Sequence, residues 1–316
     1  MKLVVMIPAF NEEESIRKVI RAIPRKIEGI DKVEILVIDD GSADDTAKAA
    51  KKAGASRIAV HRKNRGVGSA FNTGLENALE MGADIIINTD ADGQFSAKDI
   101  PRLIEPILKE KTDVVIGSRF LGKNPEMPFM KKAGNLLFSW LTRKISGADL
   151  TDTQCGFRAF TREVALRTVL FGKFTYTQEF IIRAANGCFR ITEIPIVAEK
   201  RKTGKSKVVK TWYLYGLKAI SIVLRKYTDT HPILIFGALS LAVFIVALFP
   251  FAWAMFYYLQ TGHFTGVLGS AMLAGFLFLT SLITLTFGIL ADMFVRQRIL
   301  QEDILYRQKL ERYGKR

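Results

Sequence analysis

The stretch IINTDADGQF, residues 86–95, ends an apolar run of strand length with two aspartates, a glycine and a glutamine. Alternate residues of an extended segment share a face, so Asp90 and Asp92 can reach one point beyond the end of the strand. Two hard oxygen ligands suit Mg²⁺ or Mn²⁺, which keep positions open for phosphate oxygens, and Gln94 can add a neutral oxygen. The alternative is an aspartate-rich turn that caps the helix after Ser96.

Around this stretch, short apolar runs alternate with segments of helical periodicity. The runs of strand length are Lys2–Ile7, Val33–Ile38, Arg57–Val60, Asp84–Asn88 and Asp113–Gly117. The helical segments between them are Glu13–Ile23, Asp44–Ala53, Gly68–Met81 and Ala97–Lys109. This alternation predicts an α/β fold, a mostly parallel sheet with helices on both faces.

Polar clusters follow four of the predicted strands. They are PAFNEE (8–13), DDGSADDT (39–46), DADGQ (90–94) and GSRF (117–120). In open parallel sheets, ligands bind beyond the carboxyl ends of the strands. The four clusters therefore predict one binding rim at that edge of the sheet.

The composition predicts a chain with more than one kind of segment. The 316 residues are 49% hydrophobic, yet the net charge is +15. A soluble part joined to a membrane part reconciles the two values, and the basic excess suits anionic lipid or a phosphorylated substrate. No interleaved aromatic and basic motif indicates nucleic-acid binding. The two cysteines, Cys155 and Cys188, lack CxxC spacing, so no disulfide framework or zinc site is expected.

Two long apolar segments near the C-terminus predict a membrane hairpin. Ile233–Leu259 and Val267–Val295 are each long enough to cross a bilayer, and Asp292 is the only formally charged residue from 233 to 295. A pair of buried core helices is the alternative. Basic residues predominate in 201–226 and 296–316, while the connecting QTGHFTG has no formal charge. The positive-inside rule then places both ends in the cytoplasm. The N-terminus reads as a first strand rather than a signal peptide.

Two further segments have the pattern of interfacial helices. Met130–Ile145 places Leu136, Leu137 and Trp140 on one side with basic residues at its ends, and Thr211–Tyr227 combines aromatic and aliphatic residues. Such helices lie at the headgroup level of a membrane. Ordinary packing on the sheet is the alternative for both. The expected organisation is a cytoplasmic domain (1–210), a juxtamembrane helix (211–230), a hairpin (231–295) and a basic cytoplasmic tail (296–316).

The motifs resemble those of a known family. VVMIPAFNEEESI, VIDDGSADDT, NRGVGSAFNTGL, NTDADGQF and VIGSRF occur in the order and spacing of the family 2 nucleotide-sugar glycosyltransferases of the GT-A fold. The likeness is greatest to the polyprenyl-phosphate glycosyltransferases, which include dolichyl-phosphate mannose and glucose synthases. DTQCGFRAFTREVA (152–165) is similar to the glucose type, and KRKTGKSK (200–207) with a following hairpin matches the subgroup. The QxxRW motif of processive polysaccharide synthases is absent from the sequence.

The resemblance implies residues that hold the donor, a nucleotide diphosphate sugar. The implied donor-binding residues are Pro8, Phe10, Glu12, Asp39, Asp40, Arg65, Gly66, Asp90 and Ala91. Carboxylates among them can accept hydrogen bonds from a ribose hydroxyl or a base N–H. A turn before the helix at Asp44 is the alternative for Asp39 and Asp40. Asp90, Asp92 and Gln94 would hold the Mg²⁺ or Mn²⁺ on the diphosphate.

The resemblance also implies residues for the acceptor, a polyprenyl phosphate. The candidates for its phosphate are Arg119, Lys131, Lys132, Arg201, Ser206 and Lys207, with Lys131 and Lys132 as alternatives at one position. A solvated basic loop is the alternative for the last three. Asp152 is expected to position the acceptor or the sugar, with a role as base left open and a helix cap as the alternative. Asp152, Asp92 and Arg119 are thus the catalytic candidates.

These residues predict a metal-dependent, inverting transfer of one sugar to a polyprenyl phosphate. A UDP-sugar donor such as UDP-glucose is favoured by the DTQCGF likeness, and GDP-mannose is the alternative. A membrane protein that binds nucleotide sugars without catalysis is an alternative of another class, and a protein or polysaccharide acceptor is a third. Relatives with a two-span anchor imply, by analogy, homo-oligomers.

Overall fold

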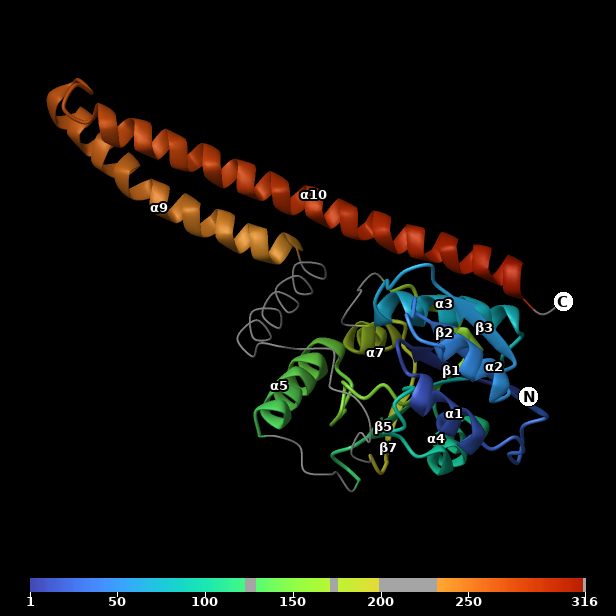
Figure 1. Ribbon diagram of the computed structural model, residues 1–316. Coiled ribbons are helices and arrows are strands. Elements are labelled where there is room, and N and C mark those ends of the chain that lie inside the picture. Colours follow the sequence, from blue (N-terminus) through green and yellow to red (C-terminus); the bar gives the residue numbers. More distant parts are fainter. Residues whose placement is uncertain (123–128, 171–175, 199–231, 315–316) are drawn as a thin grey trace. The chain divides into compact units, whose positions relative to one another are not determined.

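The chain forms two compact units. The computed structural model describes residues 1–122, 129–170, 176–198 and 232–314 (Figure 1). One unit comprises Met1–Lys210 together with Leu305–Arg316, and the other comprises Thr211–Ile304. Of the expected interfacial segments, Thr211–Tyr227 lies outside the described residues, as do Arg201, Ser206 and Lys207.

A seven-stranded sheet, ordered β3-β2-β1-β4-β6-β5-β7, forms the centre of the first unit. The strands are β1 (Lys2–Ala9), β2 (Lys32–Asp39), β3 (Arg57–Val60), β4 (Ile85–Asn88), β5 (Val114–Ser118), β6 (Arg158–Thr161) and β7 (Ile191–Pro195). Every pairing is parallel except those of β6 with β4 and β5. The predicted α/β fold with a mostly parallel sheet is confirmed, and all five predicted strands are present.

Helices accompany this sheet, and most of them place buried apolar residues in its core. They are α1 (Glu13–Ala22), α2 (Thr46–Lys52), α3 (Val67–Glu80), the 3₁₀ turn η1 (Ala97–Asp99), α4 (Ile100–Leu108), α5 (Phe129–Ser146), α6 (Arg162–Arg167) and α7 (Tyr176–Asn186). α3 contacts α6, α7 and the strands β1 and β2, while α1 contacts α2 and η1. The inner strands β1 and β4 are buried almost throughout, which explains why their sequences are continuously apolar.

The antiparallel strand β6 determines what lies at the end of β4. In the register of the two strands, Arg158 pairs with Asn88 and Thr161 pairs with Ile85. Because the strands run in opposite directions, the residues just before β6 meet the residues just after β4. The DTQCGF segment is thereby brought beside DADGQ, although the two are far apart in sequence.

Hydrogen bonds join the first two rim loops. Ala43 N donates to Asn11 Oδ1 at 2.8 Å, and Glu12 N donates to Thr46 Oγ1 at 2.9 Å. Gly41, in the second loop, has φ +73°, and a Cβ built on it would lie 2.5 Å from the carbonyl carbon of Lys63. Only glycine combines this conformation with so close a backbone approach.

The second unit contains two apolar helices, α9 (Pro232–Thr261) and the first part of α10 (Leu268–Tyr313). Both are long and apolar enough to cross a membrane, with mean hydropathies of 2.7 and 2.1 in their most apolar windows. Only 17% of each window is buried, which is too little for core helices of a soluble protein. The two predicted spans are thus present as helices.

Small residues line the contact between these two helices. Within the described part of the unit, they recur every seven positions and are Ser240, Ala247 and Ala254 on α9 and Ala274, Ser281 and Gly288 on α10. Ser240 Oγ donates to Ser281 O at 2.8 Å, and Ser281 Oγ donates to Ser240 O at 3.0 Å. Small residues and hydroxyl bonds are the means by which helices associate in lipid, where apolar burial gives no driving force. Figure 1 shows the two helices side by side.

The last turns of α10 belong to the first unit. Tyr306 Oη donates to Glu163 at 2.8 Å, and the guanidinium of Arg167 lies 4.3 Å from the centre of the Tyr306 ring. Lys309 Nζ donates to Thr168 O at 2.8 Å. The segment expected to be a basic tail is therefore helical as far as Tyr313, and its second half packs on α6 and the residue that follows it.

We predict that Gly41→Ala destabilises the protein far more than Gly82→Ala. Both glycines have nearly the same positive φ, +73° and +74°, but no atom lies within 4 Å of a Cβ at Gly82. Gly82→Ala should lower the free energy of unfolding by about 1 kcal/mol, the cost of the left-handed conformation. Gly41→Ala should lower it by about 3 kcal/mol or more, because the 63–64 backbone must also move. Thermal melts of the detergent-solubilised protein measure both, and equal melting temperatures would contradict the crowding.

Candidate functional site

The floor of the site is the junction of β4 with the loop before β6. A Cβ built on Gly156 would lie 2.8 Å from Asp90 Oδ1 and 3.3 Å from Tyr176 Oη. Gly156 O accepts a hydrogen bond from Asn88 Nδ2 at 2.7 Å, and Asn88 is fully buried. Asp90 thus rests on a glycine that cannot be larger without displacing the carboxylate.

The Asp92 turn is held by its own backbone and by an aromatic contact. Gln94 N donates to Asp92 Oδ1 at 3.1 Å, and Gly93 has φ +74°. The Phe95 ring stacks on Phe157 with centroids 5.3 Å apart and planes at 10°. Phe157 follows Gly156, so the segment that supports Asp90 also fixes the far end of the DADGQ turn.

The donor set at this turn fits a divalent metal. Asp90, Asp92 and Gln94 offer two carboxylates and an amide oxygen from one short loop. In the described part of the chain, no group of three His, Cys, Asp or Glu residues could hold a metal ion. A site with few protein ligands suits Mg²⁺ or Mn²⁺, whose remaining positions are taken by water and phosphate oxygens.

The predicted donor residues of the first two loops share one edge. Ala9 pairs with Asp39 in the β1–β2 register, so Pro8, Phe10 and Glu12 lie near the end of β2. Asp39 is buried, and its Oδ1 accepts from Ser42 N at 2.9 Å. The structure therefore brings these candidates together on the rim, as the strand order predicts.

Asp40 has a supporting position that the sequence did not predict. Its Oδ1 accepts from Arg65 N at 2.9 Å, and its Oδ2 accepts from Gly66 N at 2.8 Å. The buried His61 lies against it, with Nδ1 2.6 Å from Asp40 Oδ1 and Nε2 2.9 Å from Thr73 Oγ1. Asp40 thus holds the Arg65–Gly66 backbone in place, with His61 as a partner that no sequence pattern identified.

Arg119 and Asp152 form a buried, bidentate ion pair. Arg119 Nε lies 2.7 Å from Asp152 Oδ2, Arg119 Nη2 lies 2.9 Å from Oδ1, and the Arg119 backbone N donates to Oδ2 at 3.1 Å. The exposed fractions of the two side chains are 13% and 0%. Burial works to lower the pKa of Arg119, but the hydrogen bond and charge of Asp152 outweigh it, and the pKa lies above its ordinary value.

The surroundings of Asp152 favour an orienting role over that of a base. Glu193 accepts from the backbone N of Thr151 at 2.7 Å and from that of Asp152 at 2.8 Å, which fixes the loop. No helix begins at Thr153, so the helix-cap alternative does not apply. Both Asp152 oxygens bind Arg119, and the side chain has no exposed surface. The arrangement suits a residue that orients Arg119 better than one that accepts a proton from a substrate.

The other acceptor candidates are only partly described. Lys132 is exposed on α5, while the Lys131 side chain lies outside the described residues. No sequence pattern predicted the buried residues near Asp90, which include Cys155, Arg158 and Tyr176. Among them, Cys155 has its pKa raised to about 12, first by burial and then by the charge of Asp152, so it remains a thiol at neutral pH.

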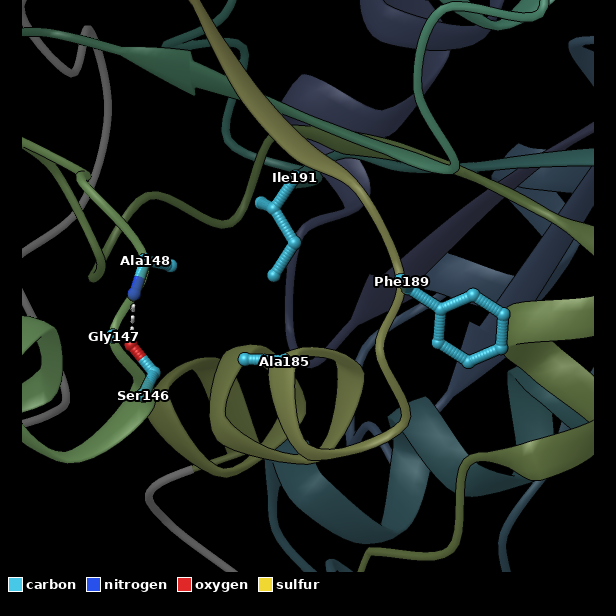
Figure 2. A pocket seen from close by; sticks show the side chains of 6 residues that line it. All are labelled: Ser146, Gly147, Ala148, Ala185, Phe189 and Ile191. Atoms are coloured by element: carbon cyan, nitrogen blue, oxygen red, sulfur yellow. Dashed lines mark hydrogen bonds between the residues drawn. The ribbon is translucent and has the colours of Figure 1, made fainter.

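The first unit also contains a hollow whose lining has no charged residue and no candidate site residue. It has a volume of about 230 Å³ and lies where α5, α7 and β7 approach one another. Figure 2 shows its lining, Ser146, Gly147, Ala148, Ala185, Phe189 and Ile191. None of these carries a charge, and none was predicted as a site residue. The candidate site therefore remains the rim at the strand ends.

We predict that Asp152→Asn destabilises the protein strongly, while Asp113→Asn barely does. Asp113 and Arg190 repeat the same three bonds, with Arg190 Nε and Nη2 each at 3.1 Å, but Arg190 is 59% exposed. Removing the buried acid leaves Arg119 without its charge partner and should cost about 3 kcal/mol or more of the free energy of unfolding. The exposed pair should contribute below about 1 kcal/mol. Thermal melts compare the two variants, and equal losses would contradict this assignment.

Comparisons with known proteins agree with this geometry. The model of glycosyl transferase family 2 matches residues 4–170. The chain is 36% identical over 214 residues to the UDP-N-acetylglucosamine–dolichyl-phosphate N-acetylglucosaminyltransferase of Methanococcus voltae, a match that covers 60% of this chain and 83% of that one. It is 31% identical over 218 residues to the undecaprenyl-phosphate mannosyltransferase of Micrococcus luteus, covering 66% of this chain and 88% of the other.

A solved structure shows the same fold. Glucosyl-3-phosphoglycerate synthase from Mycobacterium tuberculosis, crystallised with Mn²⁺, uridine diphosphate and phosphoglyceric acid, matches with a TM-score of 0.53. The sequences are 22% identical, and the match covers 72% of this chain and 77% of that chain. The family model spans more than half of the sequence and the rim motifs lie together in the fold. This chain is a glycosyltransferase of family 2 with the GT-A fold.

Proposed function

We propose that this enzyme transfers one sugar from a nucleotide diphosphate sugar, with UDP-sugars preferred, to a polyprenyl phosphate at the cytoplasmic membrane face. The observation that carries the proposal is the Asp90–Asp92 pair beside the buried Arg119–Asp152 pair. One offers ligands for a metal on a diphosphate, and the other offers a fixed cation for a second phosphate. The curated relatives whose names specify dolichyl and undecaprenyl phosphate support the acceptor class.

Asp90, Asp92 and Gln94 would hold Mg²⁺ or Mn²⁺. When bound there, the ion would act as a Lewis acid that stabilises the departing nucleotide diphosphate. Pro8, Phe10, Glu12 and Asp39 would bind the base and ribose along the rim. The Arg65–Gly66 backbone, held by Asp40, would lie beside the donor, as would Ala91.

The acceptor needs orientation more than activation. A phosphate monoester has a second pKa near 6, so it is largely dianionic at pH 7 and is already a nucleophile. Its oxygen would attack the anomeric carbon in line, while the bond to the diphosphate breaks and the nucleotide leaves with the electron pair, which inverts the configuration. Arg119, with its guanidinium fixed by Asp152, suits the binding of such a phosphate. This division of tasks agrees with an Asp152 that is buried and fully bonded.

The α5 helix supports an acceptor at the membrane surface. It buries polar side chains, with Asn135, Ser139 and Thr142 each at most 5% exposed. Phe138 is also buried, but three large apolar side chains face outward, with Leu136 48%, Leu137 50% and Trp140 53% exposed. A helix that exposes large apolar side chains and has basic residues near its ends is suited to the membrane interface. We infer that α5 lies there, with the α9–α10 hairpin in the bilayer.

We predict that Asp92→Asn strongly reduces lipid glycosylation, while Asp31→Asn does not affect it. Asp31 is 88% exposed and precedes β2, at the end of that strand away from the rim. The same Asp-to-Asn change there is therefore a matched control. Loss of a carboxylate ligand should reduce Mn²⁺-dependent UDP binding and turnover by about 100-fold. The full chain is incubated with radiolabelled UDP-glucose, UDP-N-acetylglucosamine or GDP-mannose and with dolichyl or undecaprenyl phosphate, and the lipid is extracted.

Each outcome of this experiment decides one part of the proposal. If only GDP-mannose labels the lipid, the donor is GDP-mannose and not a UDP-sugar. The similarity to a mannosyltransferase is the reason for including this donor. Label only in water-soluble acceptors would remove the lipid acceptor. Nucleotide-sugar binding without product would favour a binding protein. Unchanged turnover of Asp92→Asn would remove the metal assignment.

We predict that the 262–267 connection faces the outside of the membrane. Cys188 is exposed in the first unit and Cys155 is buried, so Cys188 reports the side on which that unit lies. An impermeant maleimide should label wild type only after the cells are permeabilised. In a Cys188→Ser background, His263→Cys should be labelled in intact cells, because His263 is exposed in the connection. Labelling of wild-type Cys188 in intact cells would contradict the orientation.

A further inference from the structure

Arg158 is a fully buried arginine in the middle of the sheet. It is 0% exposed and stands on β6, where it pairs with Asn88 on one side and Ile116 on the other. Its Nη1 donates to Thr177 O at 3.1 Å and its Nη2 donates to Cys155 O. The guanidinium carbon lies 5.2 Å from the centre of the Phe180 ring and 5.8 Å from that of Tyr176.

This charge lacks the partner that buried arginines usually have. In the described part of the chain, Arg158 forms no ion pair with a carboxylate, and its Nε has no hydrogen-bond partner. Burial lowers its pKa, yet an arginine remains protonated in a protein. A buried charge without close neutralisation is costly, and a neutral residue would pack a sheet interior at lower cost. The position therefore has a permanent positive charge that packing does not require.

The charge lies beneath the proposed metal loop. Burial lowers the pKa of Arg158, and the charges of Asp90 and Asp152 are among those that act in the opposite direction. Asp152 is bound at both oxygens by Arg119. Asp90 rests on Gly156, beside the hydroxyl of Tyr176, and the Tyr176 ring in turn flanks the Arg158 guanidinium. From the rim inward the order is Asp90, then Gly156 with Tyr176, then Arg158.

We propose that Arg158 is a positioning residue for the metal loop. Its buried charge attracts the Asp90 carboxylate onto Gly156 and offsets part of the negative charge that Asp90, Asp92 and a nucleotide diphosphate bring together. Its bonds to Cys155 O and Thr177 O also hold the segments that carry Gly156 and Tyr176. The low dielectric of the interior makes this charge effective over a longer distance than a surface charge. The inference rests on the proposed metal and donor site.

The test compares a charged and a neutral replacement that can both donate to the same carbonyls. Binding of UDP and of GDP to the full chain in detergent is measured by titration calorimetry, with Mn²⁺ and with EDTA. Arg158→Gln should weaken Mn²⁺-dependent nucleotide binding by roughly 10- to 100-fold. Arg158→Lys keeps the charge and should recover most of the affinity. Arg183→Gln is the matched control, since Arg183 is 11% exposed but is ion-paired with Glu179 at 3.1 Å, and it should bind like wild type.

The outcomes separate this inference from the function on which it rests. Absence of Mn²⁺-dependent nucleotide binding in wild type would overturn the proposed metal site itself. Mn²⁺-dependent binding that is equal in wild type and Arg158→Gln would overturn only the role of Arg158. A loss of the same size in Arg158→Lys and Arg158→Gln would assign Arg158 to packing rather than to charge.

A stability cycle in EDTA tests the same attraction without metal or nucleotide. If Arg158 and Asp90 attract each other, the double variant Asp90→Asn/Arg158→Gln should melt at a higher temperature than the two single variants predict by addition. Should Arg158→Gln alone fail to fold, the double variant is expected to fold. Strict additivity, or a double variant that also fails to fold, would overturn the proposal.

Discussion

The contact between the Asp90 carboxylate and Gly156 joins the two halves of this active site. DADGQ follows a parallel strand, and DTQCGF precedes an antiparallel one, so the two segments meet only because β6 is inserted between β4 and β5. A Cβ at Gly156 would displace the Asp90 carboxylate. From this contact follow the stacking of Phe95 on Phe157, the turn that carries Asp92 and the place of Asp152 a few residues earlier.

The charged residues of the candidate site differ in how deeply they are buried. The carboxylates proposed as ligands lie at the rim, while the pair Arg119–Asp152 is largely buried and Arg158 is buried completely. Asp40 shows the same division on the other side of the rim, since its oxygens are used to hold the Arg65–Gly66 backbone. Asp152 holds the Arg119 guanidinium and Asp40 holds a loop backbone, so buried carboxylates fix parts of the candidate site before a substrate binds.

Most of the strands and the clusters at their ends could be predicted from the sequence. The features that could not be predicted were missed for identifiable physical reasons. Strands β1, β2, β4 and β5 are buried almost throughout, so their apolar runs are continuous and easily recognised, and the edge strand β3 is short but apolar after Arg57. β6 has an arginine at its first position and β7 contains Thr192 and Glu193, so neither shows an apolar run of strand length. The rim clusters could be predicted because polar residues follow the apolar strands directly, at the strand ends where ligands bind in such sheets. The tasks of Asp40, His61, Gly156 and Arg158 depend on neighbours distant in sequence, which no local pattern records.

The ninety-four residues from Thr211 to Ile304 interrupt the catalytic unit, because Leu305 and the residues after it return to that unit. Tyr306 and Lys309 are synthesised after both apolar segments, since they lie in the last turns of α10. The surface of α6 and Thr168 that they cover therefore stays exposed while those segments are being synthesised. The catalytic unit thus gains its last contacts only after both apolar helices have been synthesised.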